Sequence, residues 1–207
     1  AFMQLPSGEV HLYFANEGPY TYSNEQEISL LRSYDRGVTW TDSAETVSFR
    51  NDRRDGMPVP LYLEDQEEIL VAIEDNGYGE FKPSILRTSL QDNWHGTTIS
   101  GGDPRREYAL EERLDPSVYA GGPFITRLTS GQVLLSYQSL EERTGSWDQS
   151  AMVVAIGDEE GKHFSRKTWP FEVPLGKWGL WNSLAVLEGD VPVALTSTNA
   201  YSSGPTE

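Results

Sequence analysis

The sequence predicts an all-β protein, a β-propeller made of four-stranded antiparallel blades. Three observations lead to this prediction. A pair of apolar strands joined by a tight polar turn occurs four times along the chain. The 19 glycines and 12 prolines are spread along the chain, as expected for many short strands joined by turns. Helical periodicity is weak everywhere, and the single candidate helix is the short segment 107–113.

The four strand pairs recur at a nearly constant interval. The leucines before their turns are Leu5, Leu63, Leu128 and Leu187, so the intervals are 58, 65 and 59 residues. We expect each repeat to add a second strand pair, at 28–32 and from 38–40 onward, at 84–87 and around Trp94, and at 151–156 and 164–169. Four strands in about 60 residues form one propeller blade with long loops.

About three and a half blades are therefore expected. Because a propeller closes with roughly 4–8 blades, we expect residues 1–207 to form one propeller domain that is cut short at its N-terminus and in its closing strands. The segment Ala1–Leu5 reads as the middle of a strand and has no signal-peptide pattern, which indicates that the chain begins partway through a larger protein. The alternative is an open sandwich whose regular spacing arises by chance.

The charge of the chain restricts its partners. A formal net charge of −16 and a pI near 4.5 argue against nucleic acid, since phosphate contacts need a basic surface. An anionic membrane surface would also repel it, and no apolar run approaches the ~18 residues of a membrane span. A neutral polysaccharide remains compatible. The chain has no cysteine, and His11, His95 and His163 lack ligand spacing, so we expect neither a metal site nor a cofactor.

One turn carries a recognisable motif. The segment 33–40 matches Ser-x-Asp-x-Gly-x-Thr-Trp, the Asp-box, with Ser33, Asp35, Gly37, Thr39 and Trp40 at the defining positions. Asp35 can accept hydrogen bonds from its own turn, Gly37 supplies a positive φ, and Trp40 is expected to fill the space between blades. Weaker copies occupy the matching places at 89–94 and 157–161. The motif is structural and faces away from an active site.

The motif resembles the Asp-boxes, or BNR repeats, of sialidase-like propellers. Four longer stretches are similar to glycoside hydrolase family 93, and they are Phe14–Glu17, Ile28–Ser33, Arg54–Pro60 and Ala72–Gly77. The resemblance runs through nearly the whole chain. It implies a six-bladed propeller that cleaves α-1,5-arabinan from its end and releases arabinobiose. It also implies a secreted or extracellular protein whose partner is a carbohydrate, and it leaves the oligomeric state open.

The loops between the second and third strands and those between blades are expected to share one face, where carboxylates, arginines and aromatics collect. Glu17 and Glu74 leave the second strands of adjacent blades and could approach within the ~5–5.5 Å of a retaining glycosidase. By the resemblance, Glu17 is the nucleophile and Glu74 the general acid/base, with the order of these roles open and Asp75 as the reserve candidate. The alternative is that both glutamates are solvated loop carboxylates.

Further side chains on these loops are candidates for substrate binding. They are Tyr20, Tyr22, Arg54, Asp55, Asp75 and Trp178. Aromatic rings can stack on sugar faces, and Arg54 with Asp55 can clamp substrate hydroxyls. The alternatives are an ion pair that ties the loop, tyrosines that only cover the blade, and a tryptophan that packs in the core.

Three functions remain open at this point. The first is an exo-acting, retaining arabinan hydrolase. The second is an exo-sialidase, which needs a tyrosine nucleophile and three arginines around the substrate carboxylate. Arg54 and Arg127 could be two of those arginines, but no convincing third is present. The third is a non-catalytic, glycan-binding propeller.

Overall fold

The computed structural model describes residues 1–96 and 98–202, and it is built almost entirely of β-strands. Fourteen strands form three four-stranded antiparallel sheets and one two-stranded sheet within the described residues. Neighbouring strands in each sheet are also neighbours in the sequence. This meander is the strand order that a chain of short strands and tight turns favours. The predicted all-β class is therefore confirmed.

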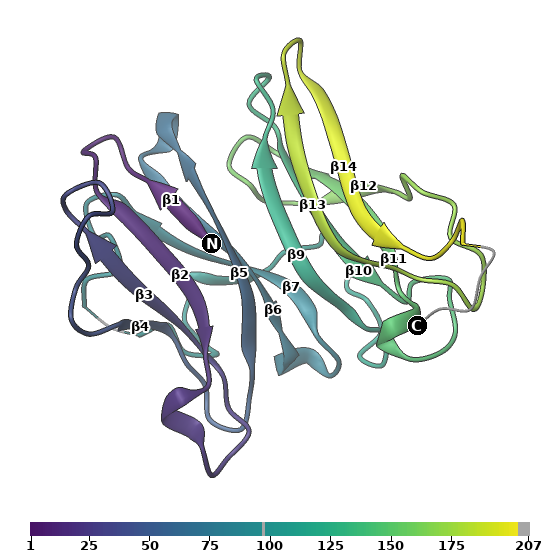
Figure 1. Cartoon of the computed structure of the whole chain (residues 1–207), viewed down its shortest axis with the longest axis horizontal. Helices are drawn as coiled ribbons and strands as arrows, with labels where there is room; N and C mark the ends of the chain where they lie inside the picture. Colours follow the sequence, from purple (N-terminus) through teal and green to yellow (C-terminus); the bar gives the residue numbers. More distant parts are fainter. Residues whose placement is uncertain (97, 203–207) are drawn as a thin grey trace. The chain divides into compact units, whose positions relative to one another are not determined.

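The first sheet contains β1, β2, β3 and β4, which are Phe2–Gln4, Val10–Asn16, Glu27–Ser33 and Glu45–Ser48. The second contains β5, β6, β7 and β8, which are Asp55–Leu63, Glu68–Asp75, Lys82–Ser89 and Arg106–Tyr108. The third contains β9, β10, β11 and β12, which are Ala120–Arg127, Val133–Ser139, Ala151–Gly157 and Ser165–Thr168. Figure 1 shows β1, β2 and β3 side by side in the first sheet.

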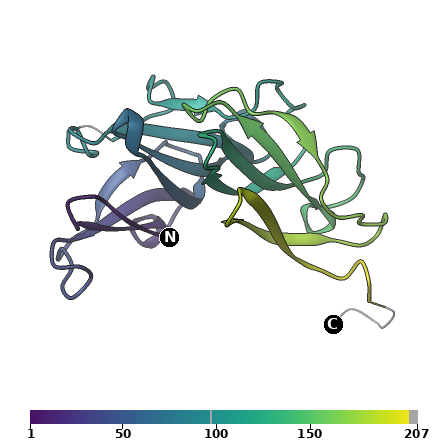
Figure 2. The same ribbon diagram turned by 90° about the horizontal axis from the view of Figure 1, so that it is seen from above.

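The last two strands, β13 (Gly179–Leu187) and β14 (Val191–Thr198), pair as a hairpin, drawn in yellow-green and yellow in Figure 2. In the part of the chain that the structure describes, four short 3₁₀ helices lie in the connections, and they are η1 (Gly18–Tyr20), η2 (Glu64–Gln66), η3 (Asn76–Tyr78) and η4 (Trp147–Gln149). No helix among the described residues is long and apolar enough to cross a membrane.

The chain divides into two compact units. The first unit consists of residues 1–77 and 84–108, and the second consists of residues 78–83 together with the chain from Ala109 onward. The first unit contains the first sheet and most of the second. The second unit contains the third sheet and the β13–β14 hairpin, and β13 lies beside β9 within it (Figure 1).

The predicted strand pairs around the four turns are all present, but two of the predicted fourth strands are wrong. The first sheet closes with β4, which begins at Glu45, well after Trp40. The second sheet closes with β8, whereas Trp94 lies in a turn. The candidate helix at 107–113 overlaps β8, which the sequence did not predict. Arg106 and Tyr108 pair with Leu86 and Ser84 of β7, and this ladder outweighs a weak local helical preference.

The core of the first unit joins its two sheets. Tyr13, on β2, is fully buried, and its hydroxyl accepts a 2.7 Å hydrogen bond from the indole nitrogen of Trp94. Aliphatic side chains of both sheets, including Ile28 and Ile73, belong to the same cluster. Trp94 thus fills the space that was expected for Trp40. The Trp40 ring instead lies 6.0 Å from that of Phe2, on β1 of its own sheet.

The turn from Ser33 to Trp40 connects β3 and β4, as predicted. Asp35 accepts hydrogen bonds from the Thr39 hydroxyl (2.6 Å), the Thr39 backbone nitrogen (2.7 Å) and the Ser33 hydroxyl (2.8 Å). These bonds lower the pKa of Asp35 to about 2. Gly37 has φ +89°, and its backbone nitrogen donates to the Ser33 hydroxyl at 2.7 Å. A glycine is required there because a side chain would be strained at this φ.

Candidate active site

The two candidate catalytic glutamates lie at matching ends of strands in the first unit. Glu17 follows the last residue of β2 and precedes η1. Glu74 is the last residue but one of β6, where it faces Gly56 of β5 in the antiparallel ladder. Glu17 is more than half exposed, with 57% of its side chain accessible, while Glu74 is half-buried.

A short chain of contacts links these two carboxylates. The Gln26 side-chain nitrogen donates to Glu17 Oε1 at 2.8 Å. A Cβ placed on Gly56 would lie 2.7 Å from Gln26 Oε1 and 2.8 Å from Glu74 Oε1. Gln26 therefore touches one glutamate and comes near the other, across the backbone of Gly56. Because Gly56 has no side chain, Gln26 and Glu74 can both lie next to its backbone.

Arg54 also contacts Glu17. Its guanidinium forms a salt bridge with Glu17 Oε1 and donates to the backbone oxygen and to the Oδ1 of Asn24, at 3.0 and 3.1 Å. Its backbone nitrogen donates to Asn76 Oδ1 at 2.8 Å. Arg54 thus connects the loops that follow β2 and β6. This is the alternative given above, an ion pair that ties the loop. It also contacts a candidate catalytic carboxylate.

Asp55 and Asp75 were expected to touch substrate, but the structure buries both. Their side chains are 1% and 0% exposed. Arg106 bridges them, with 2.6 Å to Asp55 Oδ2 and 2.7 Å to Asp75 Oδ2, and Arg50 contacts the Oδ1 atoms of both at 2.6 Å. Ser48, from β4, contacts Asp55 and Arg106. This geometry favours a structural role beneath the site over substrate contact or catalysis.

The cluster of Arg50, Arg106, Asp55 and Asp75 was not found by sequence reasoning. Neither arginine lies in a motif, and nothing local marks their partners. Arg106 reaches carboxylates that are 31 and 51 residues earlier in the chain. Gln26 was missed as well, since a lone glutamine carries no motif. The sequence predicted only that Asp55 and Asp75 lie near strand ends.

The two candidate tyrosines have different surroundings. Tyr20 donates to Glu27 Oε2 at 2.6 Å, and its ring stacks on Phe49 with centroids 5.1 Å apart. Burial and the neighbouring Glu27 carboxylate raise the pKa of Tyr20. The Tyr20 ring therefore covers the end of the sheet, as in the alternative in which the tyrosines only cover the blade. Its face against Phe49 is not open to a sugar. Tyr22 is fully exposed in the loop between η1 and β3.

Trp178 belongs to the second unit, directly before β13. It is half-buried, its backbone nitrogen donates to Asn199 Oδ1 at 2.8 Å, and its carbonyl accepts from the Thr198 hydroxyl. Trp181, three residues further along the chain, is more exposed.

No group of three or more His, Asp or Glu side chains in residues 1–96 and 98–202 is placed to hold a metal ion.

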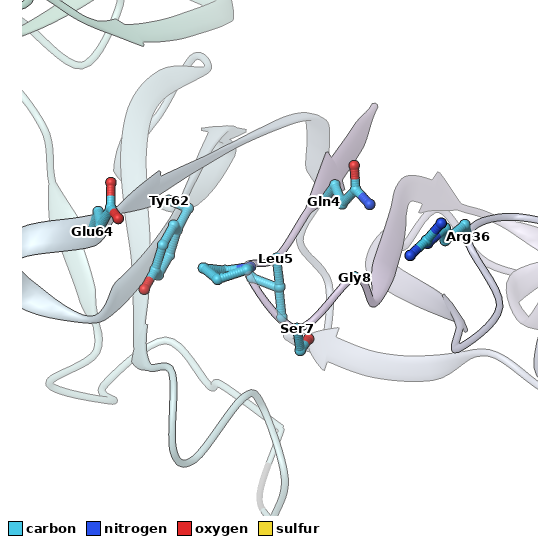
Figure 3. Close-up of a pocket in the computed structure, with 8 residues that line it drawn as sticks. Gln4, Leu5, Ser7, Gly8, Arg36, Tyr62 and Glu64 are labelled. Carbon is cyan, nitrogen blue, oxygen red and sulfur yellow. The ribbon is translucent and has the colours of Figure 1, made fainter.

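A pocket of about 570 Å³ lies at the other ends of the strands in the first unit. The β1–β2 turn contributes Ser7 and Gly8, the β3–β4 turn contributes Arg36, and the end of β5 contributes Tyr62. Figure 3 shows Tyr62 and Glu64 on one side of Leu5 and Arg36 on the other. The pocket contains no candidate catalytic residue, because β2 and β6 run from this end toward Glu17 and Glu74.

The four-stranded antiparallel sheets of this chain are similar in arrangement to those in solved structures of β-propeller glycoside hydrolases. An α-L-arabinanase of Penicillium chrysogenum, solved with arabinobiose, is 13% identical with a TM-score of 0.60 over 95% of this chain and 57% of its own. A GH93 α-L-arabinofuranosidase of Fusarium graminearum, also solved with arabinobiose, is 13% identical with a TM-score of 0.54 over 92% of this chain and 66% of its own.

A thermostable family-43 glycoside hydrolase is 12% identical, with a TM-score of 0.63 over 99% of this chain and 66% of its own. No protein-family model matches the sequence, and no curated protein sequence matches it. At these identities the likeness to solved structures shows the fold alone. This chain spans 57% of the length of the Penicillium enzyme.

Proposed function

We propose that the protein is a glycoside hydrolase that cleaves α-1,5-arabinan from its end and retains the anomeric configuration, with Glu17 and Glu74 as its catalytic pair. The observation that carries this proposal is that Gln26, which donates to Glu17, and Glu74 both adjoin Gly56. Two of the similar structures were solved with arabinobiose, which supports an arabinan substrate.

The proposed reaction has two steps, as in other retaining glycosidases. In the first, the Glu17 carboxylate attacks the anomeric carbon while the Glu74 carboxyl protonates the leaving oxygen, so that a glycosyl ester forms and the glycosidic bond breaks. In the second, ionised Glu74 takes a proton from water, whose oxygen attacks the anomeric carbon and releases Glu17. Arg54 and Gln26 orient the Glu17 carboxylate for both steps.

Several finer assignments belong to the same proposal. The turn 33–40 is an Asp-box of the sialidase-like type, which the hydrogen bonds around Asp35 support. The sheets are blades of a six-bladed propeller. Tyr22 is the sequence-predicted tyrosine that remains open to a sugar, since Tyr20 is engaged with Glu27. We place the protein outside the cell, where a polymeric plant-type glycan would be met.

The sialidase alternative is less well supported. Arg54 is engaged with Glu17 and Asn24, and Arg127 donates to the Gly131 carbonyl at 3.1 Å, in the β9–β10 turn. Neither guanidinium is arranged as a clamp for a sialic acid carboxylate, which needs converging arginines.

Incubation of the protein with linear α-1,5-arabinan tests the proposed function. Arabinobiose should appear as the first product, and NMR should show that it is released with the anomeric configuration of the substrate. Turnover of a sialoside without turnover of arabinan would establish the sialidase instead. Binding of arabinan without any product would establish the non-catalytic glycan-binding protein.

Gly56→Ala is expected to lower kcat/KM on arabinan by about 10–100-fold, because the new methyl group would lie within 2.8 Å of Gln26 and Glu74 and push the catalytic carboxylate away. Steady-state kinetics measure this effect, and circular dichroism checks the fold. Gly102→Ala is the matched control, since a Cβ at Gly102 would meet nothing within 4 Å. Equal activity of the two variants would contradict the placement of the site.

A further inference from the structure

Two large exposed tryptophans lie together in the second unit. Trp147 is 47% exposed and Trp181 is 58% exposed, and their ring centroids are 6.3 Å apart. The row of rings continues inward from Trp147 to Tyr119, 6.3 Å away, and from there to Phe81, 6.4 Å away. Tyr119 is buried. An exposed aromatic pair that rests on a buried ring is typical of a surface that binds a ligand.

The backbone of Trp181 is held in a conformation that bulky residues avoid. Its φ is +54°, and the β13–β14 ladder shifts register between Leu180 and Ser183 around it. Left-handed backbone of this kind is costly for a tryptophan and persists where the surrounding structure enforces it. The buried Gln138 side chain accepts from the Trp181 backbone nitrogen at 2.8 Å, and Asn182 donates to the Gly122 carbonyl at 2.8 Å. These bonds fix the bulge that points Trp181 outward.

The same irregularity recurs in the first unit, beside the candidate catalytic site. Met57 on β5 has φ +49°, and the ladder shifts between Gly56 and Val59. Met57 directly follows Gly56, which faces Glu74 across the ladder. The repeat therefore gives Trp181 the place in its own sheet that Met57 has beside Glu74.

The loop that carries Trp147 is also rigid. The Ser150 hydroxyl donates to the Trp147 carbonyl at 2.6 Å. The Arg143 guanidinium donates to four carbonyl oxygens, those of Gln149, Val173, Pro174 and Lys177, at 2.6–3.2 Å. This arginine ties the loop to its neighbour and is occupied by backbone, so it is not offered to an anionic ligand.

From these observations we infer that Trp147 and Trp181 form a sugar-binding platform for a neutral polysaccharide. The inference rests on the proposed function and adds a binding surface for its substrate. Flat apolar rings match the C–H faces of a sugar, rigid aromatics bind at a low entropic cost, and a chain with a net charge of −16 disfavours anionic polymers.

The test is binding of linear arabino-oligosaccharides to the protein carrying Glu74→Gln, measured by isothermal titration calorimetry so that turnover does not interfere. Trp147→Ala and Trp181→Gly should each weaken binding roughly tenfold or more. Glycine is used at 181 because it accepts the left-handed backbone. Trp181→Phe should retain most of the affinity. Sialyllactose, an anionic sugar, should not bind at the same site.

Trp169→Ala is the matched control, since Trp169 is a third exposed tryptophan of the second unit, at 39%. Its affinity should equal that of the parent. Binding that survives both platform substitutions, or that is absent in the parent, would overturn the platform. Hydrolysis is measured separately in proteins with Glu74 intact, so a failed platform can be told apart from a failed catalytic proposal.

Discussion

Glutamine in place of Glu74 or of Glu17 is expected to lower turnover of linear arabinan by about a thousandfold or more, while the fold is kept. Each substitution preserves the shape of the side chain and removes the proton transfer or the nucleophilic oxygen on which one step depends. Both side chains lie at strand ends and outside the core cluster, so the free energy of unfolding should change little. Steady-state rates and thermal melting measure the two effects.

A second substrate distinguishes the nucleophile from the general acid/base. An aryl arabinoside with an activated leaving group does not need protonation of that group, so it should restore the first step in the Glu74 variant and not in the Glu17 variant. Asp42→Asn is the control, because Asp42 is an exposed carboxylate of the same unit. Near-normal turnover of arabinan in either glutamate variant would refute its assignment.

Arg106→Met is expected to lower the free energy of unfolding by about 3–5 kcal/mol, the usual cost of removing one partner from a buried ion pair. Burial alone would lower the pKa of Arg106, but the hydrogen bonds and charges of Asp55 and Asp75 outweigh burial and raise it. Methionine replaces the unbranched aliphatic part of arginine without its charge, and it leaves both carboxylates buried with Arg50 as their remaining cation. Urea denaturation of the wild type and the variant measures the loss.

Arg53→Met provides the comparison, since Arg53 is exposed and lies in the same loop region of the first unit. It should unfold within about 0.5 kcal/mol of the wild type. Because Asp75 directly follows Glu74, the Arg106 variant should also lose arabinan hydrolysis. A destabilisation below about 1 kcal/mol would show that the cluster is not the structural support that its geometry indicates.

The candidate site divides into a part that the sequence could predict and a part that it could not. The sequence predicts Glu17 and Glu74 as site residues because each leaves the second strand of its repeat, while their catalytic roles are implied by the resemblance to glycoside hydrolase family 93. The burial of Asp55 and Asp75 was not visible, because acidic residues beside strand ends look alike whether they face solvent or an arginine. The arginine that pairs with both aspartates, Arg106, lies in β8, a strand that the sequence did not predict.

What the sequence determined by itself was the local architecture: the four strand pairs, their tight turns and the hydrogen-bonded turn around Asp35. These features depend on residues within a few positions of one another, and apolar alternation and glycine placement encode such contacts directly. The tertiary structure alone decided that Trp94 fills the space expected for Trp40, that two aspartates are buried, and that Gly56 leaves room for Gln26 and Glu74. Those outcomes depend on contacts between residues far apart in the chain, which no local pattern records.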